Sequence, residues 1–130
     1  MTARILYIED NEQNFYLVRF ILVARGHQVT WARDGRDGID EALRSAYDLI
    51  LLDIQLPVMD GYSVARSLRS HDAVARVPIV ALTSYAMTGD REKAIEAGCS
   101  GYIEKPINPQ IFAVQVEEFL TGGEPGARVP

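Results

Sequence analysis

Residues 49–53, Leu49-Ile50-Leu51-Leu52-Asp53, decide the fold of this 130-residue chain. Four consecutive apolar side chains in so short a run are typical of a strand that is buried on both faces, as in a parallel sheet. Ligands of such sheets bind outside the carboxyl ends of the strands, which is where Asp53 is placed. A lone carboxylate there could simply cap the next turn, so Asp53 must be judged by the residues that accompany it.

A second acidic site follows another apolar run in the same way. The run Ile5-Leu6-Tyr7-Ile8 is followed directly by Glu9 and Asp10. If the two strands are neighbours in a parallel sheet, their carboxylates share one small space at its carboxyl edge. The acidic residues are therefore candidates for a joint site.

The rest of the chain alternates between strand and helix patterns. Apolar runs indicate further strands, and amphipathic stretches with capping residues indicate helices. The expected strands cover 5–8, 28–32, 49–53, 78–83 and 101–104, and the expected helices cover 11–25, 36–46, 62–69, 90–97 and 108–120. This alternation predicts an α/β fold with a doubly wound, five-stranded parallel sheet, right-handed crossovers and five helices.

The length suits a single domain with a sizeable core. We expect this domain to cover residues 1–120 and a disordered C-terminal tail to cover residues 121–130. The tail contains Thr121-Gly122-Gly123-Glu124-Pro125-Gly126-Ala127, which cannot form a packed element. No output domain is expected after it.

Composition and charge argue against several classes of protein. The net charge is −5 and no Lys/Arg cluster offers phosphate contacts, which disfavours a direct nucleic-acid partner. No segment approaches the about 18 apolar residues of a membrane span, and the first strand begins too early to leave room for a signal peptide. One cysteine, Cys99, excludes an internal disulfide and fits a reducing cytosol. These features predict a cytoplasmic protein.

Distinctive polar groups end four of the five predicted strands. In the strand order 2-1-3-4-5 of flavodoxin-like sheets, one crevice would collect Glu9, Asp10, Asp53, Thr83 and Lys105. Clustered carboxylates repel and raise one another's pKa. A hard divalent cation and the nearby lysine ammonium are the two devices that could hold them ionised.

Magnesium, or manganese in its place, is therefore the expected cofactor. Mg²⁺ prefers a few protein carboxylates together with waters and a substrate phosphate. Asp10 and Asp53 are the candidates for direct ligands, with the backbone carbonyl of Gln55 as a third. Glu9 has one methylene more than an aspartate and is expected to act through a coordinated water.

Four motifs together resemble a known family. They are Ile8-Glu9-Asp10-Asn11, Leu52-Asp53-Ile54-Gln55-Leu56-Pro57-Val58-Met59-Asp60-Gly61, Ala81-Leu82-Thr83-Ser84 and Lys105-Pro106. Each motif alone is weak evidence, but in this order and at these spacings they are highly specific. Over residues 3–120 the chain resembles a stand-alone two-component response-regulator receiver domain.

The resemblance implies a role for each residue of the crevice. Asp53 would accept a phosphoryl group from a phosphohistidine on a histidine kinase or a phosphotransfer protein. Asp10, with Glu9, would bind magnesium, which neutralises charge on the transferring phosphoryl group. Lys105 would pair with a phosphoryl oxygen. Thr83 would move inward to donate a hydrogen bond to the phosphoryl group.

The resemblance extends to residues around the crevice. Tyr102 matches an aromatic switch that follows the threonine inward, and the bond between Lys105 and Pro106 matches one that is commonly cis in the family. In the family, the positions of Gln55 and Tyr85 border the phosphoryl group and influence how fast water reaches it. A residue as bulky as Tyr85 predicts slow spontaneous hydrolysis.

The first predicted helix has two apolar stripes. The stripe expected to pack on the sheet consists of Asn14, Leu17, Val18, Ile21 and Leu22. Tyr16, Phe20 and Val23 form another on the opposite face, at i, i+4 and i+7. Such a stripe usually marks a partner surface, here for a phosphotransfer helix or a second copy of this chain in a homodimer. The alternative is that these long side chains fold back over neighbouring helices.

The main functional prediction is a receiver that signals through phosphorylation-dependent binding of a downstream protein. Such a protein is not an enzyme beyond its own phosphorylation and dephosphorylation. One alternative is a degenerate receiver that is only an interaction module. Another is an aspartyl-nucleophile phosphohydrolase, which usually needs an acid where Gln55 stands. A nucleotide binder is disfavoured because the G-x-G-x-x-G and P-loop patterns are absent.

The sequence identifies neither the kinase, the downstream target nor the pathway. A relay shuttle, a phosphate sink and a kinase regulator would share the same motifs, because they differ in their partner surfaces.

Overall fold

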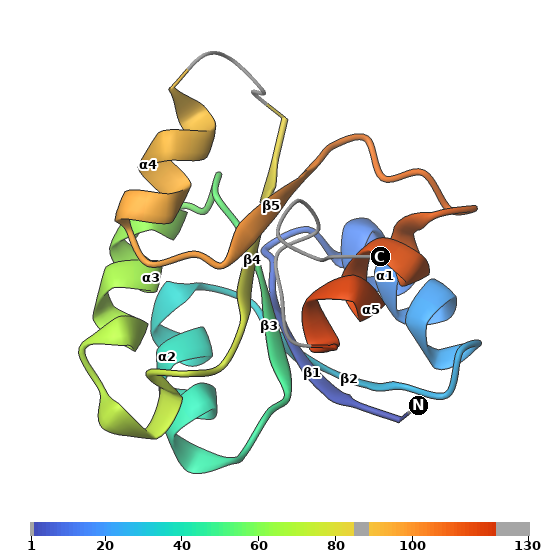
Figure 1. Ribbon diagram of the computed structural model, residues 1–130, viewed down its shortest axis with the longest axis horizontal. Coiled ribbons are helices and arrows are strands. Elements are labelled where there is room, and N and C mark those ends of the chain that lie inside the picture. Colours follow the sequence, from blue (N-terminus) through green and yellow to red (C-terminus); the bar gives the residue numbers. More distant parts are fainter. Residues whose placement is uncertain (1, 85–88, 122–130) are drawn as a thin grey trace.

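The computed structural model describes residues 2–84 and 89–121, which form a five-stranded sheet flanked by α-helices (Figure 1). The strands are β1 (Arg4–Ile8), β2 (Gln28–Ala32), β3 (Leu49–Asp53), β4 (Ile79–Thr83) and β5 (Gly101–Glu104). The helices are α1 (Glu12–Val23), α2 (Gly35–Arg44), α3 (Gly61–Arg69), η1 (Asp72–Val74, 3₁₀), α4 (Asp90–Glu96) and α5 (Phe112–Leu120). The strand order is β2-β1-β3-β4-β5 and all pairings are parallel, which confirms the predicted fold class.

The sheet separates two apolar cores, because side chains alternate between its faces. α1 and α5 cover one face, and α2, α3 and α4 cover the other (Figure 1). In β3, Leu49 and Leu51 face the first core, whereas Ile50 and Leu52 face the second. All residues of β3 are buried, so this apolar run is the central, doubly covered strand that its composition predicts.

The buried face of α1 differs from the predicted stripe. The members of that stripe that are buried are Val18, Ile21 and Leu22. The prediction was wrong for Asn14 and Leu17, which are exposed. Phe15 is buried instead, and its ring stacks on Trp31 of β2 with centroids 4.5 Å apart. The large ring of Phe15 buries more apolar surface than either predicted side chain, and that determines how the helix is turned.

Four helices begin at other residues than predicted, α1 and α3 by a single residue. α2 begins one residue earlier, at Gly35, because Asp34 is its N-cap. α5 begins at Phe112 rather than Asn108, because residues 109–111 form a turn. Part of the predicted tail, residues 122–130, lies outside the described residues.

The loop after β3 is held close to the strand end. A Cβ on Gly61, the first residue of α3, would lie 2.5 Å from the Ile54 Cα and 2.7 Å from the Asp53 carbonyl oxygen. Only glycine permits so close an approach. The Gly61 N–H donates to the Ile54 carbonyl at 3.0 Å, so the chain leaves Asp53 along a defined path.

The same loop contains a strained γ-turn. The Met59 N–H donates to the Pro57 carbonyl at 2.7 Å, and the central residue, Val58, has a φ of 67°. This conformation is unfavourable for a β-branched residue. Because the Val58 side chain is 108% exposed, its own packing does not offset the strain.

Replacing Val58 with glycine should stabilise the protein. Glycine removes about 1–3 kcal/mol of strain at positive φ, and it costs about 0.5–1 kcal/mol in chain entropy. We expect Val58→Gly to raise the free energy of unfolding by about 1 kcal/mol in urea denaturation. Val58→Ala is the control, because it keeps a Cβ at positive φ and should give no comparable gain. An unchanged or lower stability of the glycine variant would contradict the prediction.

Candidate functional site

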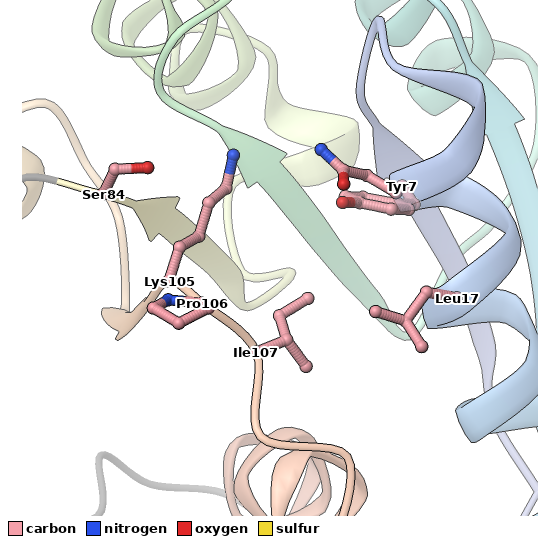
Figure 2. Close-up of a pocket in the computed structure, with 7 residues that line it drawn as sticks. Tyr7, Leu17, Ser84, Lys105, Pro106 and Ile107 are labelled. Atoms are coloured by element: carbon pink, nitrogen blue, oxygen red, sulfur yellow. The ribbon is translucent and has the colours of Figure 1, made fainter.

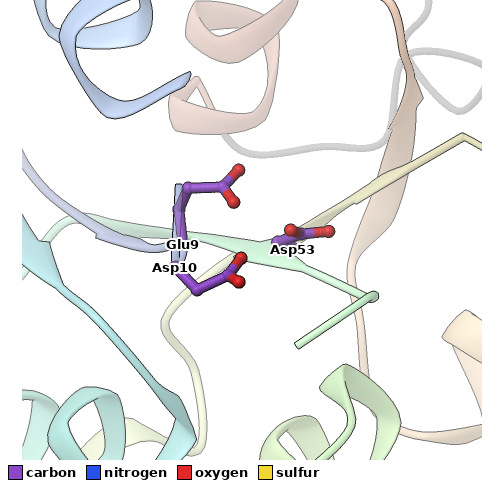
Figure 3. Close-up of side chains that lie close together, drawn as sticks. All are labelled: Glu9, Asp10 and Asp53. Carbon is purple, nitrogen blue, oxygen red and sulfur yellow. The ribbon is translucent and has the colours of Figure 1, made fainter. Parts of the chain in front are cut away.

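The carboxylates of Glu9, Asp10 and Asp53 form one cluster at the carboxyl edge of the sheet (Figure 3). Glu9 and Asp10 directly follow β1, and Asp53 ends β3. The two strands are neighbours in parallel register, with Ile8 opposite Leu52. One oxygen from each carboxylate lies within 4.8 Å of the others. The structure therefore brings together the two acidic sites that follow apolar runs in the sequence.

Lys105 brings the positive charge of the site. Its Nζ lies 3.0 Å from the Asp53 Oδ1 and 3.9 Å from the Glu9 Oε1. Its backbone N–H donates to the Thr83 carbonyl at 2.8 Å, which extends the β4–β5 ladder and places the residue at the strand end. The Lys105–Pro106 peptide bond is cis, in agreement with the resemblance.

Asp53 is almost fully buried, with 3% of its surface exposed. The Gln55 N–H donates to the Asp53 Oδ1 at 3.0 Å, and the Lys105 ammonium binds the same oxygen. The two bonds orient the carboxylate, and neither of them involves Oδ2. The position of the Gln55 carbonyl as a metal ligand stays a prediction.

Glu9 is also buried, with 1% of its surface exposed, and it is held by several donors. Its Oε1 accepts from the Tyr7 hydroxyl at 2.8 Å and the Asn14 side chain at 3.4 Å, and its Oε2 accepts from the Asn11 N–H at 3.2 Å. Burial raises the pKa of Glu9 above its ordinary value, and the charge of Asp53 raises it further, while the Tyr7 hydroxyl opposes both. The metal-free cluster is therefore electrostatically unfavourable.

Thr83 and Tyr102 lie on the same face of the sheet. Thr83 is buried at the end of β4, and Tyr102 is half-buried against the core beneath α2, α3 and α4. In the β4–β5 register Thr83 lies opposite Glu104, two residues after Tyr102. The switch role that the resemblance implies for these two side chains, and their movement, stay predictions.

A pocket of about 470 Å³ lies beside the cluster, between α1 and the loop after β5 (Figure 2). Lys105 and Tyr7, which both bind carboxylates of the cluster, contribute to its wall. Leu17 and Ile107 approach each other from opposite sides of the pocket (Figure 2). The pocket therefore combines a charged end with apolar walls.

The outward stripe of α1 is exposed as predicted. Tyr16, Phe20 and Val23 are 54%, 77% and 45% exposed. At such exposure Phe20 is not folded back over neighbouring helices, which rules out that alternative for this residue. Phe20 and Leu17 line a second pocket of about 340 Å³ between α1 and α5. The partner itself stays a prediction.

Sequence reasoning missed two residues that shape the site. Tyr7 was assigned only to a strand, yet its hydroxyl binds Glu9. Trp31 donates its indole N–H to the Glu9 carbonyl at 2.6 Å. A tyrosine within an otherwise aliphatic run is a signal for the first, because a buried hydroxyl needs a polar partner. No local pattern pointed to the second.

The donor set of the cluster fits a hard divalent cation. Three carboxylates within 4.8 Å offer only oxygen ligands, which suit Mg²⁺ and Mn²⁺ rather than a soft metal. Asp10 is exposed, so the cluster is open to solvent on that side. Asp10 and Asp53 could hold such an ion directly, because Glu9 is already engaged by protein donors.

Comparison with family models matches residues 5–117 to the response regulator receiver domain. The chain belongs to this family of two-component signalling proteins, and receiver domains are signalling modules rather than classical enzymes. The match confirms the resemblance that the four sequence motifs carry. None of the helices within residues 2–84 and 89–121 combines the length and the apolar character that a membrane crossing requires.

Individual relatives agree with the family assignment. The polar-differentiation response regulator DivK of Brucella ovis is 37% identical over 120 residues, which cover 92% of this chain and 98% of DivK. The receiver domain of the Pseudomonas aeruginosa sensor histidine kinase PA1611 is 37% identical, with a TM-score of 0.85 over 94% of this chain and 100% of that one. Its structure has a magnesium ion coordinated in the active site cleft. Vibrio cholerae chemotaxis protein CheY4 is 25% identical, with a TM-score of 0.86 over 91% and 98%.

Replacing Asp10 with asparagine should stabilise the metal-free protein, because the change removes one of three clustered negative charges. Two carboxylates about 5 Å apart repel by about 1 kcal/mol when water screens them as it does in bulk, which suits an exposed group such as Asp10. We expect urea denaturation in EDTA to show a gain of about that size for Asp10→Asn. Asp40→Asn, at an exposed position in α2, should change little. A loss of stability on the Asp10 substitution would contradict the idea that the cluster is strained.

Proposed function

We propose that Asp53 accepts a phosphoryl group from a phosphohistidine on a histidine kinase or a phosphotransfer protein, in a reaction that depends on Mg²⁺. The observation that supports this most directly is the buried pair of Asp53 and Lys105 at 3.0 Å, with two further carboxylates beside it. Two further carboxylates beside an ion pair oppose folding, so a purely structural role does not explain them. A site that binds a divalent cation and a phosphoryl group does explain them.

Asp10 and Asp53 are the proposed direct ligands of Mg²⁺ or Mn²⁺, with the Gln55 carbonyl as a third. Glu9 would act through a coordinated water, since the Tyr7 hydroxyl already binds its carboxylate at 2.8 Å. The bound ion would supply positive charge that reduces the repulsion between the carboxylates and the incoming phosphoryl group.

Asp53 is the proposed nucleophile. Its Oδ1 binds the Gln55 N–H and the Lys105 ammonium, which leaves Oδ2 as the oxygen that forms the new bond to phosphorus. The phosphorus–nitrogen bond of the phosphohistidine breaks at the same time and its electron pair stays on that nitrogen, and the imidazole leaves as the neutral ring because its other nitrogen carries a proton taken from solvent. Lys105 is close enough to pair with an oxygen of the transferred group.

Thr83 and Tyr102 are the proposed sensors of the product. Thr83 would move inward to donate a hydrogen bond to the phosphoryl group, and Tyr102 would follow into the space it leaves. Thr83 ends β4 and Tyr102 belongs to the adjacent β5, on the side of the sheet that α4 covers. Their movement would reshape the surface formed by α4, β5 and α5, to which a downstream protein would bind.

The chemistry would be limited to the protein's own phosphorylation and dephosphorylation. Gln55 stands where an aspartyl-nucleophile phosphohydrolase usually has an acid, and an amide cannot donate a titratable proton. Slow hydrolysis of the acyl phosphate follows from that difference. Tyr85, which was expected to slow hydrolysis further, lies outside the described residues.

The α1 surface formed by Tyr16, Phe20 and Val23 is the proposed docking site for the helix that bears the phosphohistidine. Leu17 lines both the pocket beside the carboxylates and the pocket beside Phe20. The apolar surface therefore continues from the proposed phosphorylation site along α1. A second copy of this chain is the other occupant to be tested.

A cytoplasmic location agrees with this function. Cys99 is a free, buried thiol, and the cytosol keeps thiols reduced. No direct nucleic-acid contact and no membrane insertion are expected for the domain.

Acetyl phosphate with Mg²⁺ should phosphorylate the protein on Asp53. Intact mass spectrometry should show one added phosphoryl group that hydroxylamine removes, since hydroxylamine cleaves acyl phosphates. The signal should be absent from Asp53→Asn and in EDTA, and it should persist in Asp40→Asn. Label on another residue, or no label on the wild-type protein, would leave a degenerate receiver as the better description. Rapid turnover of unrelated phosphoesters would favour the phosphohydrolase.

Phe20→Glu should slow phosphotransfer from a phosphohistidine donor by about tenfold or more, because a charge in an apolar contact costs at least about 1.4 kcal/mol. Labelling by acetyl phosphate should not change, since this small donor needs no docking surface. Leu43→Glu, on the opposite side of the sheet in α2, is the control. If self-association in size-exclusion chromatography and the phosphotransfer rate both match the wild-type protein, the α1 stripe is not a partner surface.

A further inference from the structure

Trp31, the single tryptophan of the chain, hydrogen-bonds the loop that carries the acid pair. It lies in β2, the edge strand next to β1. The Glu9 N–H donates to the Ala32 carbonyl at 3.0 Å, and the Glu9 carbonyl accepts from the Trp31 indole at 2.6 Å. The indole thus holds the chain to β2 just beyond the last residue of β1.

This hydrogen bond acts on the peptide unit that joins Glu9 to Asp10. The carbonyl of Glu9 and the N–H of Asp10 belong to one planar group. A bond that fixes the carbonyl therefore sets the direction in which the chain leads into Asp10. Rotation of this unit would carry the Asp10 Cα, and with it the carboxylate, away from Asp53.

The two acids differ in how much they depend on that peptide unit. The Glu9 carboxylate is held by Tyr7, Asn11 and Asn14. The Asp10 carboxylate is exposed and has no hydrogen-bond partner within residues 2–84 and 89–121. The position of Asp10 is consequently set by its backbone, which makes the Trp31 bond more important for Asp10 than for Glu9.

The indole is itself well fixed. The Phe15 ring stacks on it with centroids 4.5 Å apart and planes 8° apart. The Arg33 guanidinium lies 4.2 Å from the centre of the ring, and it takes the other face because Phe15 covers the first. Stacking and cation–π contacts both restrict the rotamers of Trp31. A rigid donor is what a positioning role requires.

We propose that Trp31 is a positioning residue for the metal site, because its indole N–H holds the Glu9–Asp10 peptide unit and so directs the Asp10 carboxylate toward Asp53. The inference rests on the proposed function, in which Asp10 is a metal ligand. Trp31 touches neither the metal nor the phosphoryl group in this role. Its effect is on metal affinity through the geometry of Asp10.

Trp31→Phe tests the proposal, because phenylalanine keeps an aromatic ring between Phe15 and Arg33 but has no N–H. The full chain is titrated with Mn²⁺, and the free ion is measured by electron paramagnetic resonance, with Mg²⁺ added as a competitor. We expect Trp31→Phe to raise the Kd for Mn²⁺ about tenfold, as loss of a group that orients a ligand does. Urea denaturation in EDTA records the stability of the same samples.

Phe119→Leu is the matched control. It removes a buried ring of α5, and it leaves both the indole N–H and the stacking partner of the indole in place. This variant should lose stability and keep a Kd within about twofold of the wild-type value. A merely structural role of Trp31 would instead make Kd follow stability in both variants, or leave it unchanged in both. A Trp31→Phe protein that binds Mn²⁺ as tightly as the wild-type protein would overturn the proposal.

A measurement on the unaltered chain gives an independent answer. With one tryptophan, the protein has a single indole N–H signal in a nitrogen–proton NMR spectrum. Addition of Mg²⁺ should shift this signal along the same saturation curve as the Asn11 amide. If the amide moves and the indole does not, the proposal fails while the metal site stands. If neither moves and Mn²⁺ does not bind, the proposed function fails together with it.

Discussion

The parallel pairing of β1 with β3 is the constraint on which the rest of the site depends. Ile8 lies opposite Leu52, so the residues that follow the two strands leave the sheet at the same edge. This pairing brings Glu9, Asp10 and Asp53 together, and one carboxylate oxygen of each lies within 4.8 Å of the others. Two of these carboxylates are buried, where water screens their repulsion poorly. The neighbouring structure has to supply positive charge or hydrogen-bond donors.

The sheet supplies both from other strands. Lys105, at the end of β5, reaches the Asp53 Oδ1 and lies within 4 Å of Glu9, and the Tyr7 hydroxyl binds Glu9 from within β1. One ammonium does not balance three carboxylates, and the pKa of Glu9 is raised, first by burial and then by the charge of Asp53. The remaining negative potential favours a divalent cation. The clustered carboxylates therefore lower the stability of the metal-free fold, and the same carboxylates are what the proposed chemistry needs to bind a cation.

Particular residues show how far the sequence could predict this arrangement. Four residues of the site could be placed together because each ends or closely follows a recognisable strand, and the carboxyl ends of parallel strands meet at one edge. They are Asp10, Asp53, Thr83 and Lys105. The orientation of α1 could not be derived as surely. Its helical period fits more than one stripe, and only contact with the sheet selects Phe15 over its neighbours. Trp31 was missed because its role depends on a hydrogen bond across two strands.

The sequence by itself determined the alternation of strands and helices, the identity of the central strand and the polar groups at the strand ends. These features are local, because burial imposes a short period on apolar residues. Only the tertiary structure decided that Lys105 binds Oδ1 of Asp53 and that protein donors such as the Tyr7 hydroxyl bind the Glu9 carboxylate. The same holds for the hydrogen bond from the Trp31 indole to the Glu9 carbonyl. Such contacts join side chains distant in the chain, and their geometry follows from how whole elements pack rather than from any pattern within one of them.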